Sequence, residues 1–278
     1  MSKFPRTEVG GVSLSRLIIG TNWFLGYSHT SKAKDNFINS YMTAEKIAEV
    51  FEAFLEQGID TVMGPFHFKL FEAIEIAQEK TGQKMIPILT PAFDVWNLGD
   101  PEMAPEKVLD DCANAGCVIC MPHQMVTDAL VDRRAGVIRD IDQYMQMIRD
   151  RGMIPGLASH MPETVRYVDK KKVDAESYIQ LYNAAGFLMQ VEADWIMRII
   201  QKAKKPVMTI KPLAAGRLLP PVGLAFVWNT IRDQDMVTIG TTTPDEAKEV
   251  IDLSLSFLEK RIPDLELQKT RSKRSLEN

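Results

Sequence analysis

The chain has 278 residues, of which 45% are hydrophobic and 25% charged, a balance that is ordinary for one globular α/β domain. Its formal net charge of −4 gives no basic face for a nucleic acid or an anionic membrane, so we expect a small-molecule partner and neither of those. No apolar run approaches the ~18 residues that span a bilayer, and the N-terminus lacks the apolar core of a signal peptide, so a cytoplasmic location is expected.

The predicted elements alternate between short apolar strands and helices along most of the chain. Two short strands flank Gly10-Gly11, and this hairpin is expected to cap the floor of a barrel. A buried strand follows at 17–20, and a helix begins after Thr43, a candidate N-cap. Further strands are expected at 59–63, 84–90, 117–121 and 153–158 and from Pro206 and Met236, and helices near 68–80, 105–113, 138–150, 162–168 and 222–231.

The sixth repeat offers two apolar runs, 177–182 and 187–191. We prefer the first as the strand, because Val191, Trp195 and Ile199 follow helical spacing.

The last helix has the clearest start signal, with Thr243 as N-cap, Pro244 at the first position and Glu246 completing a capping box. Eight strand-and-helix repeats without a break in composition predict a single-domain (β/α)8 TIM barrel over residues 1–262. A polar C-terminal tail is expected at 263–278.

The loops after the last two strands indicate an anion site. Lys211 and Arg217 follow the seventh strand, and the amides at Thr241 and Thr242 follow the eighth and lead into a helix. Backbone amides and the helix dipole favour an anion, and these two loops are the usual phosphate-binding place in such barrels. We expect the four residues to bind the charged end of a substrate, unless Arg217 points to solvent and pairs with an acidic residue of the last helix.

All four histidines, His29, His67, His123 and His160, follow predicted strands, where barrel enzymes carry their chemistry. Histidines in loops are often simply solvated, so their position alone does not make them functional. His123 and His160 are the best pair, because their strands are neighbours. They are expected to act as acid/base groups, or to bind a divalent metal with Asp94 or His67 as the third ligand.

Lys211 lies at the outgoing end of a strand between an isoleucine and a proline, so it should be partly desolvated. It could form a Schiff base with a carbonyl, as in aldolase-type chemistry, or pair with an anionic substrate group, which we prefer. Trp23, His67 and Trp96 are expected beside the same mouth, where aromatic rings would suit a sugar-like substrate.

The chain resembles the aldo-keto reductases in four segments, which follow one another as the corresponding barrel segments do in that family: 17–21, 58–61, 211–218 and 239–242. The resemblance implies a (β/α)8 barrel and NAD(P)H-dependent carbonyl reduction by an Asp, Tyr, Lys and His tetrad. It assigns the Asp to Asp60 and the His to His123.

The chain departs from the family at the other two tetrad positions. Pro65-Phe66 stands where the Tyr is expected, and Pro91 follows Thr90 where the Lys is expected. Ile210 replaces the ring that the family stacks on nicotinamide. We interpret the chain as a divergent relative that kept the barrel and changed the chemistry.

The sequence therefore predicts an enzyme that acts on a carbonyl- or sugar-like, anionic small molecule by acid/base or metal-assisted, non-redox chemistry, as a lyase, aldolase or isomerase. Asp60, His123, His160 and Lys211 are the expected catalytic residues. An NAD(P)H-dependent oxidoreductase and a non-catalytic ligand-binding barrel are the alternatives. A divalent metal and NAD(P) are the candidate cofactors, and a homo-oligomer is compatible with the sequence.

Overall fold

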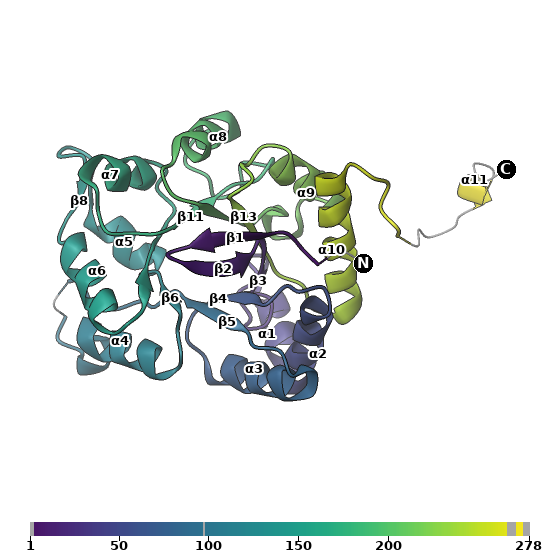
Figure 1. Ribbon diagram of the computed structural model, residues 1–278, viewed down its shortest axis with the longest axis horizontal. Helices are drawn as coiled ribbons and strands as arrows, with labels where there is room; N and C mark the ends of the chain where they lie inside the picture. Colours follow the sequence, from purple (N-terminus) through teal and green to yellow (C-terminus); the bar gives the residue numbers. More distant parts are fainter. Residues whose placement is uncertain (1–2, 97, 266–270, 275–278) are drawn as a thin grey trace.

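The computed structural model describes residues 3–96, 98–265 and 271–274, and its centre is a ring of parallel strands (Figure 1). Nine strands of this part of the chain pair in the order β10-β11-β12-β13-β3-β4-β5-β6-β9. The two ends of that order, β9 (Ile154–Pro155) and β10 (Leu157–Ser159), are separated in the chain only by Gly156. They are two halves of one strand position, so the ring closes over eight positions. The other seven are β3 (Leu17–Gly20), β4 (Thr61–Gly64), β5 (Ile86–Leu89), β6 (Ile119–Cys120), β11 (Tyr178–Leu181), β12 (Val207–Ile210) and β13 (Met236–Ile239).

Gly156 allows the neighbouring strands to approach closely where β9 gives way to β10. A Cβ atom there would lie 2.7 Å from the Met121 side chain and 3.0 Å from the Ser177 carbonyl oxygen. Any larger residue would push these strands apart.

The N-terminal hairpin covers the amino ends of the barrel strands. It consists of β1 (Arg6–Val9) and β2 (Val12–Ser15), paired antiparallel around Gly10 and Gly11. Both glycines have positive φ, 56° and 85°, as a two-residue hairpin turn requires. The hairpin packs Val9 and Leu14 onto the cluster of apolar side chains inside the barrel, which confirms the predicted cap.

Eight helices of the described chain form the outer layer and pack a second, larger apolar cluster against the strands. They bury the faces that helical spacing predicted, as in the first of them, which buries Ile47, Phe51 and Phe54. The eight are α2 (Ala44–Leu55), α3 (Phe68–Thr81), α4 (Pro105–Asn114), α6 (Ile141–Asp150), α7 (Glu163–Lys171), α8 (Ala193–Lys202), α9 (Pro220–Trp228) and α10 (Pro244–Glu259).

The choice of sixth strand is confirmed, because β11 pairs in parallel with β10 and β12. The structure adds elements that periodicity did not predict. The largest, α1 (Lys32–Tyr41), buries only Ile38 and so carries no apolar stripe to detect. The others are α5 (Gln124–Leu130), the short hairpin of β7 (Val131–Asp132) and β8 (Val137–Ile138), and the single turns η1 (Pro101–Met103), η2 (Ala214–Gly216) and α11 (Arg271–Arg274).

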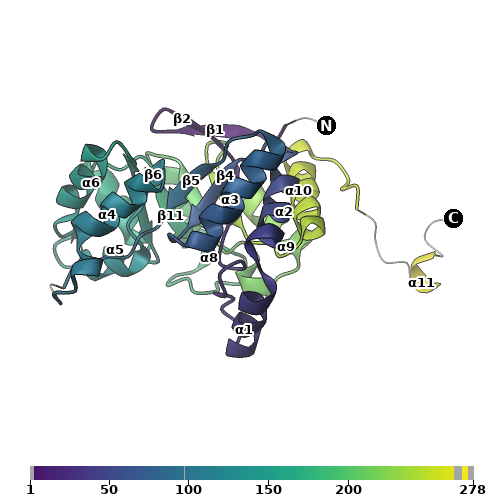
Figure 2. The same cartoon turned by 90° about the horizontal axis from the view of Figure 1, so that it is seen from below.

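The hairpin and α1 lie at opposite ends of the barrel (Figure 2). The predicted tail, 263–278, falls partly outside the described residues. Within the described chain, no helix combines the length and apolar character needed to cross a bilayer.

Candidate active site

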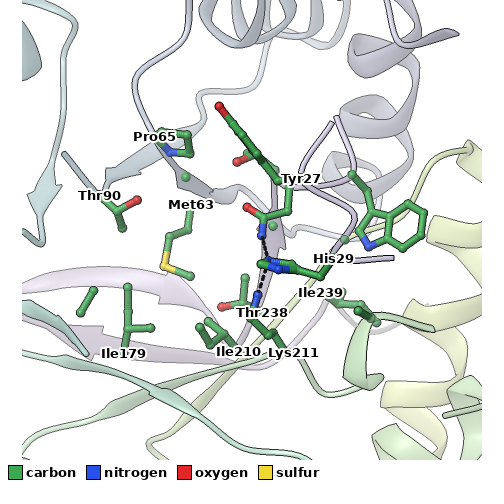
Figure 3. Close-up of a pocket in the computed structure, with 18 of the residues that line it drawn as sticks. Tyr27, His29, Met63, Pro65, Thr90, Ile179, Ile210, Lys211, Thr238 and Ile239 are labelled. Carbon is green, nitrogen blue, oxygen red and sulfur yellow. Dashed lines mark hydrogen bonds between the residues drawn. The ribbon is translucent and has the colours of Figure 1, made fainter. Parts of the chain in front are cut away.

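A cavity of about 1160 Å³ opens at the carboxyl ends of the barrel strands. Its lining includes residues at or just after the ends of β3, β4, β5, β6, β10, β12 and β13, which is where (β/α)8 enzymes place their chemistry. Met63, Thr90, Ile179, Ile210 and Thr238 form part of its wall (Figure 3).

Among the basic side chains that line this cavity, four interact with one another: Lys211, His29, His123 and His160. The Nζ atom of Lys211 lies 2.8 Å from Nε2 of His29. Burial, followed by the charges of Lys211, His123 and His29, lowers the pKa of His160 to about 4. The imidazoles are therefore mostly neutral at pH 7 and can accept protons.

Lys211 is half-buried at the end of β12, in the left-handed backbone region with φ of 60°. Burial lowers the pKa of its ammonium group to about 8. Among the described residues, no carboxylate lies within ion-pair distance of its Nζ atom. No negative charge near Lys211 therefore offsets the desolvation of its charged form, and its side-chain hydrogen-bond partner is the uncharged His29 ring.

His123 and His160 are held by the backbone around them. His123 is the N-cap of α5, and its Nδ1 accepts a hydrogen bond from the Met125 amide at 3.3 Å, which leaves Nε2 for the cavity. Burial and then the charge of Lys211 lower the pKa of His123. The amide of His160 donates to Oδ2 of Asp128 at 3.3 Å.

Asp128 is a supporting residue that the sequence analysis missed, because α5 was not predicted. Its Oδ1 atom accepts a hydrogen bond of 2.5 Å from the Ser159 hydroxyl, and burial raises the pKa of its carboxyl group. Asp128 thus ties the turn after β10, which carries His160, to the helix α5.

Asp60 is not at the mouth, so its assignment as a catalytic residue is wrong. It precedes β4 at the amino end of the strand, and its carboxylate pairs with Arg6 of the hairpin at 2.9 Å. The residues of this strand that line the cavity are Met63 and Gly64 at its carboxyl end, and Asp60 stabilises the floor instead.

The predicted metal site of His123, His160 and Asp94 is not formed. The carboxylate of Asp94 accepts hydrogen bonds from the amides of Trp96, Leu98 and Gly99 in its own loop, and it does not line the cavity. In the described part of the chain, no group of three or more His, Cys, Asp or Glu side chains is arranged to hold a metal ion.

Two of the three residues expected to bind substrate through a ring lie outside the cavity lining. His67 is exposed and accepts the Lys69 amide as the N-cap of α3, and Trp96 is 54% exposed. Trp23 does line the cavity, with Lys34 above its ring at 5.5 Å. Lys34 lies on α1, which explains why the sequence pattern did not identify it.

The predicted anion site is filled by the protein itself. The amide and hydroxyl of Thr242 donate to the Glu246 carboxylate at 2.7 and 2.8 Å. Thr241 and Thr242 line the cavity, whereas the exposed Arg217 does not; its guanidinium lies 4.0 Å above the Phe187 ring. The capping box thus closes on Thr242 rather than on the N-cap, Thr243, whose hydroxyl still accepts the Glu246 amide.

This corner does not fit the phosphate of a nicotinamide cofactor. The carboxylate of Glu246 already occupies the Thr242 donors, and Glu249 lines the same wall. A phosphate group there would face two carboxylates and no free donor from Thr242.

The fold is shared with known enzymes. No family model matches the chain, and no curated protein matches it in sequence. Among solved structures, a protein from Pseudomonas aeruginosa assigned by inference to the aldo-keto reductases superimposes with a TM-score of 0.66 at 13% identity, covering 92% of this chain and 97% of that one. An aldo/keto reductase from Brucella melitensis superimposes with a TM-score of 0.60 at 13% identity, covering 90% of this chain and 93% of that one. A native KDPGal structure superimposes with a TM-score of 0.51 at 11% identity, covering 88% of this chain and 93% of that one. At these identities the similarity establishes the TIM-barrel fold.

Proposed function

We propose that this chain is a barrel enzyme that acts on a carbonyl-bearing small molecule without net redox, in the manner of a lyase, aldolase or isomerase, and that Lys211 forms an imine with the substrate. One observation carries the proposal: Lys211 is desolvated in the cavity, has no carboxylate partner among the described residues, and lies 2.8 Å from a histidine nitrogen.

The desolvation of Lys211 makes its amine available as a nucleophile. With a pKa of about 8, roughly a tenth of the amine is neutral at pH 7. For an ordinary lysine the neutral fraction is below about a thousandth, so burial raises the concentration of nucleophile by more than about 10²-fold.

The chemistry then needs a base beside the imine. Attack of the amine on the carbonyl and loss of water give an iminium, which withdraws electrons from the adjacent carbon. A C–H or C–C bond at that carbon can then break, and its electron pair forms an enamine. His123 and His160 line the same cavity with lowered pKa values, so a neutral imidazole can take the proton released in this step.

The lysines of the cavity favour an anionic substrate. Lys34 and Lys211 both line it, and the charged end of the substrate would bind beside them rather than beside Glu246 and Glu249, which line the same cavity. The apolar side chains of Met63 and Ile179 and the ring of Trp23 suit the carbon skeleton of an oxo acid or a sugar acid. Within this proposal, Lys34 and Lys211 bind the anionic group of the substrate, in place of the expected Arg217.

Borohydride trapping tests the proposal. Incubation with pyruvate and borohydride should add the reduced adduct to Lys211, detected by mass spectrometry of the digested protein. The Lys211→Met variant should show no adduct at this position. Lys69→Met is the matched control, because Lys69 is also partly buried with a lowered pKa but lies outside the cavity lining, and the variant should keep the Lys211 adduct. Adducts spread evenly over surface lysines would contradict the proposal.

An NAD(P)H-dependent oxidoreductase is the second candidate, supported by the shared fold with aldo-keto reductases. It requires the cofactor to bind despite Glu246 and Glu249. Titration with NADPH and NADH, followed by nicotinamide fluorescence, separates the two candidates: micromolar binding would favour the oxidoreductase.

A further inference from the structure

His29 reaches Lys211 from a distant part of the sequence. It lies between β3 and α1, 182 residues before Lys211, and its ring occupies the rim of the cavity with Nε2 turned to the Lys211 Nζ atom (Figure 3). Asn22 also approaches Nε2, at 3.4 Å, and the Phe187 ring meets the imidazole edge-on at 6.5 Å between centroids.

Both partners of this contact have strained backbones. His29 has φ of 55° and Lys211 has φ of 60°, in the left-handed region that costs a non-glycine residue about 1 kcal/mol or more. The His29 turn is fastened by its neighbour Ser28, whose amide and hydroxyl donate to the Asp35 carboxylate of α1 at 3.0 and 2.6 Å. Strain of this kind gathers at functional sites, where the surrounding structure holds it in place.

The neighbours of His29 define its protonation. Lys211 is a donor when charged, so Nε2 is the unprotonated nitrogen and accepts the hydrogen bond. The pKa of His29 is lowered, and burial is the largest cause. The charges of Lys211 and Arg217 lower this pKa further, whereas the Asp35 carboxylate raises it. His160 also interacts with the ring across the cavity. His29 is thus a neutral acceptor at pH 7.

We propose that His29 is the catalytic proton carrier for Lys211 during imine formation. This inference rests on the proposed function, because it gives His29 a role in a reaction at the Lys211 amine. Nε2 takes a proton from the ammonium, and the free amine attacks the carbonyl carbon while the proton that leaves nitrogen moves to the carbonyl oxygen. The His29 imidazolium then donates its proton to the hydroxyl of the carbinolamine, the C–O bond breaks, and water leaves. The net change converts an ammonium and a carbonyl into an iminium and one water.

The test separates proton transfer from the nucleophilicity of the amine. His29→Asn is the variant of choice, because asparagine tolerates the left-handed backbone region and keeps a hydrogen-bonding side chain, but its amide neither takes up nor releases a proton at neutral pH. Two reagents are applied at pH 7 to the full chain. Formaldehyde with cyanoborohydride methylates Lys211 through an iminium, which requires loss of water, whereas trinitrobenzenesulfonate needs only the free amine. In each case mass spectrometry gives the extent of reaction at Lys211 relative to Lys34 in the same sample.

His29→Asn should lower the Lys211-to-Lys34 ratio for methylation by on the order of 10²-fold, the usual contribution of a general acid/base. The ratio for trinitrophenylation should stay level or rise, because that reaction needs only the free amine and the shorter asparagine stabilises the ammonium no better than His29 does. His67→Asn is the matched control, since His67 lies outside the cavity lining, and both ratios should stay at the native level.

Two outcomes would overturn the inference. If both ratios fall together in His29→Asn, the residue only shapes the site; if neither falls, it is a bystander. Formaldehyde needs no specific recognition, so failure of pyruvate trapping in the native chain would count against the proposed function while leaving this assay readable.

Discussion

The Lys211→Met variant should be more stable than the native chain at neutral pH, even though it loses the proposed nucleophile. Burial lowers the pKa of Lys211 from an ordinary value of 10.5 to about 8, so folding at pH 7 must desolvate a charge that has no carboxylate partner among the described residues. A shift of this size corresponds to about 3 kcal/mol, an upper value because the methionine also loses the contact with His29. Methionine keeps most of the apolar stem and removes the charge.

The sign of the pH dependence follows from the direction of the shift. Between pH 8 and 10.5 the unfolded chain holds the Lys211 proton and the folded chain does not, so the native protein gains stability as the pH rises. The advantage of the variant should therefore fall from about 3 kcal/mol at pH 7 to less than about 1 kcal/mol at pH 10.

Urea denaturation of both proteins at pH 7 and pH 10 measures this difference, and other titrating groups cancel in the comparison. Equal free energies of unfolding at pH 7, or a gap that does not change with pH, would refute the view that Lys211 is a desolvated ammonium. The imine proposal would then lose its main support.

Three further predictions concern the framework of the site. Asp235→Ala should lower the free energy of unfolding by about 3–5 kcal/mol in urea denaturation, because it leaves the buried Val207 amide without its acceptor and the half-buried Arg232 without its carboxylate partner. Glu246→Gln should cost about 0.3–1 kcal/mol, because the amide oxygen can still accept from Thr242 but the favourable negative charge at the helix N-terminus is lost; it should also increase the shift of melting temperature by sulfate, and an unchanged shift would argue that removing this charge does not open an anion site at this corner. Gly64→Ala should destabilise the barrel by about 1–3 kcal/mol, because its methyl group would collide with a buried threonine hydroxyl, and an unchanged melting temperature would contradict this.

The barrel could be predicted from the sequence because its signals are local. The period of apolar residues places the strands and helices of the eight barrel repeats within a few residues, and the caps at Thr43 and Thr243 act over three positions. The sixth strand was chosen correctly on helical spacing alone. The helix α1 escaped the same reasoning, because only one of its side chains is buried and the pattern carries no stripe.

The site depended on contacts that no local pattern encodes. The sequence placed His123, His160 and Lys211 after strands, and the structure brings them into one cavity. It could not show that His29 would meet Lys211, because that contact joins turns 182 residues apart.

The tertiary structure also decided the position of two carboxylates, and in both cases a difference of a few residues along the chain was enough. Asp60 lies one residue before its strand begins, which puts its carboxylate at the floor beside Arg6 and not at the mouth. The Glu246 carboxylate turns back to Thr242 and fills the expected anion site. Periodicity and capping propensity determine where an element lies in the chain, whereas the end of the barrel that a side chain occupies, and the partner it finds there, depend on strand boundaries and packing.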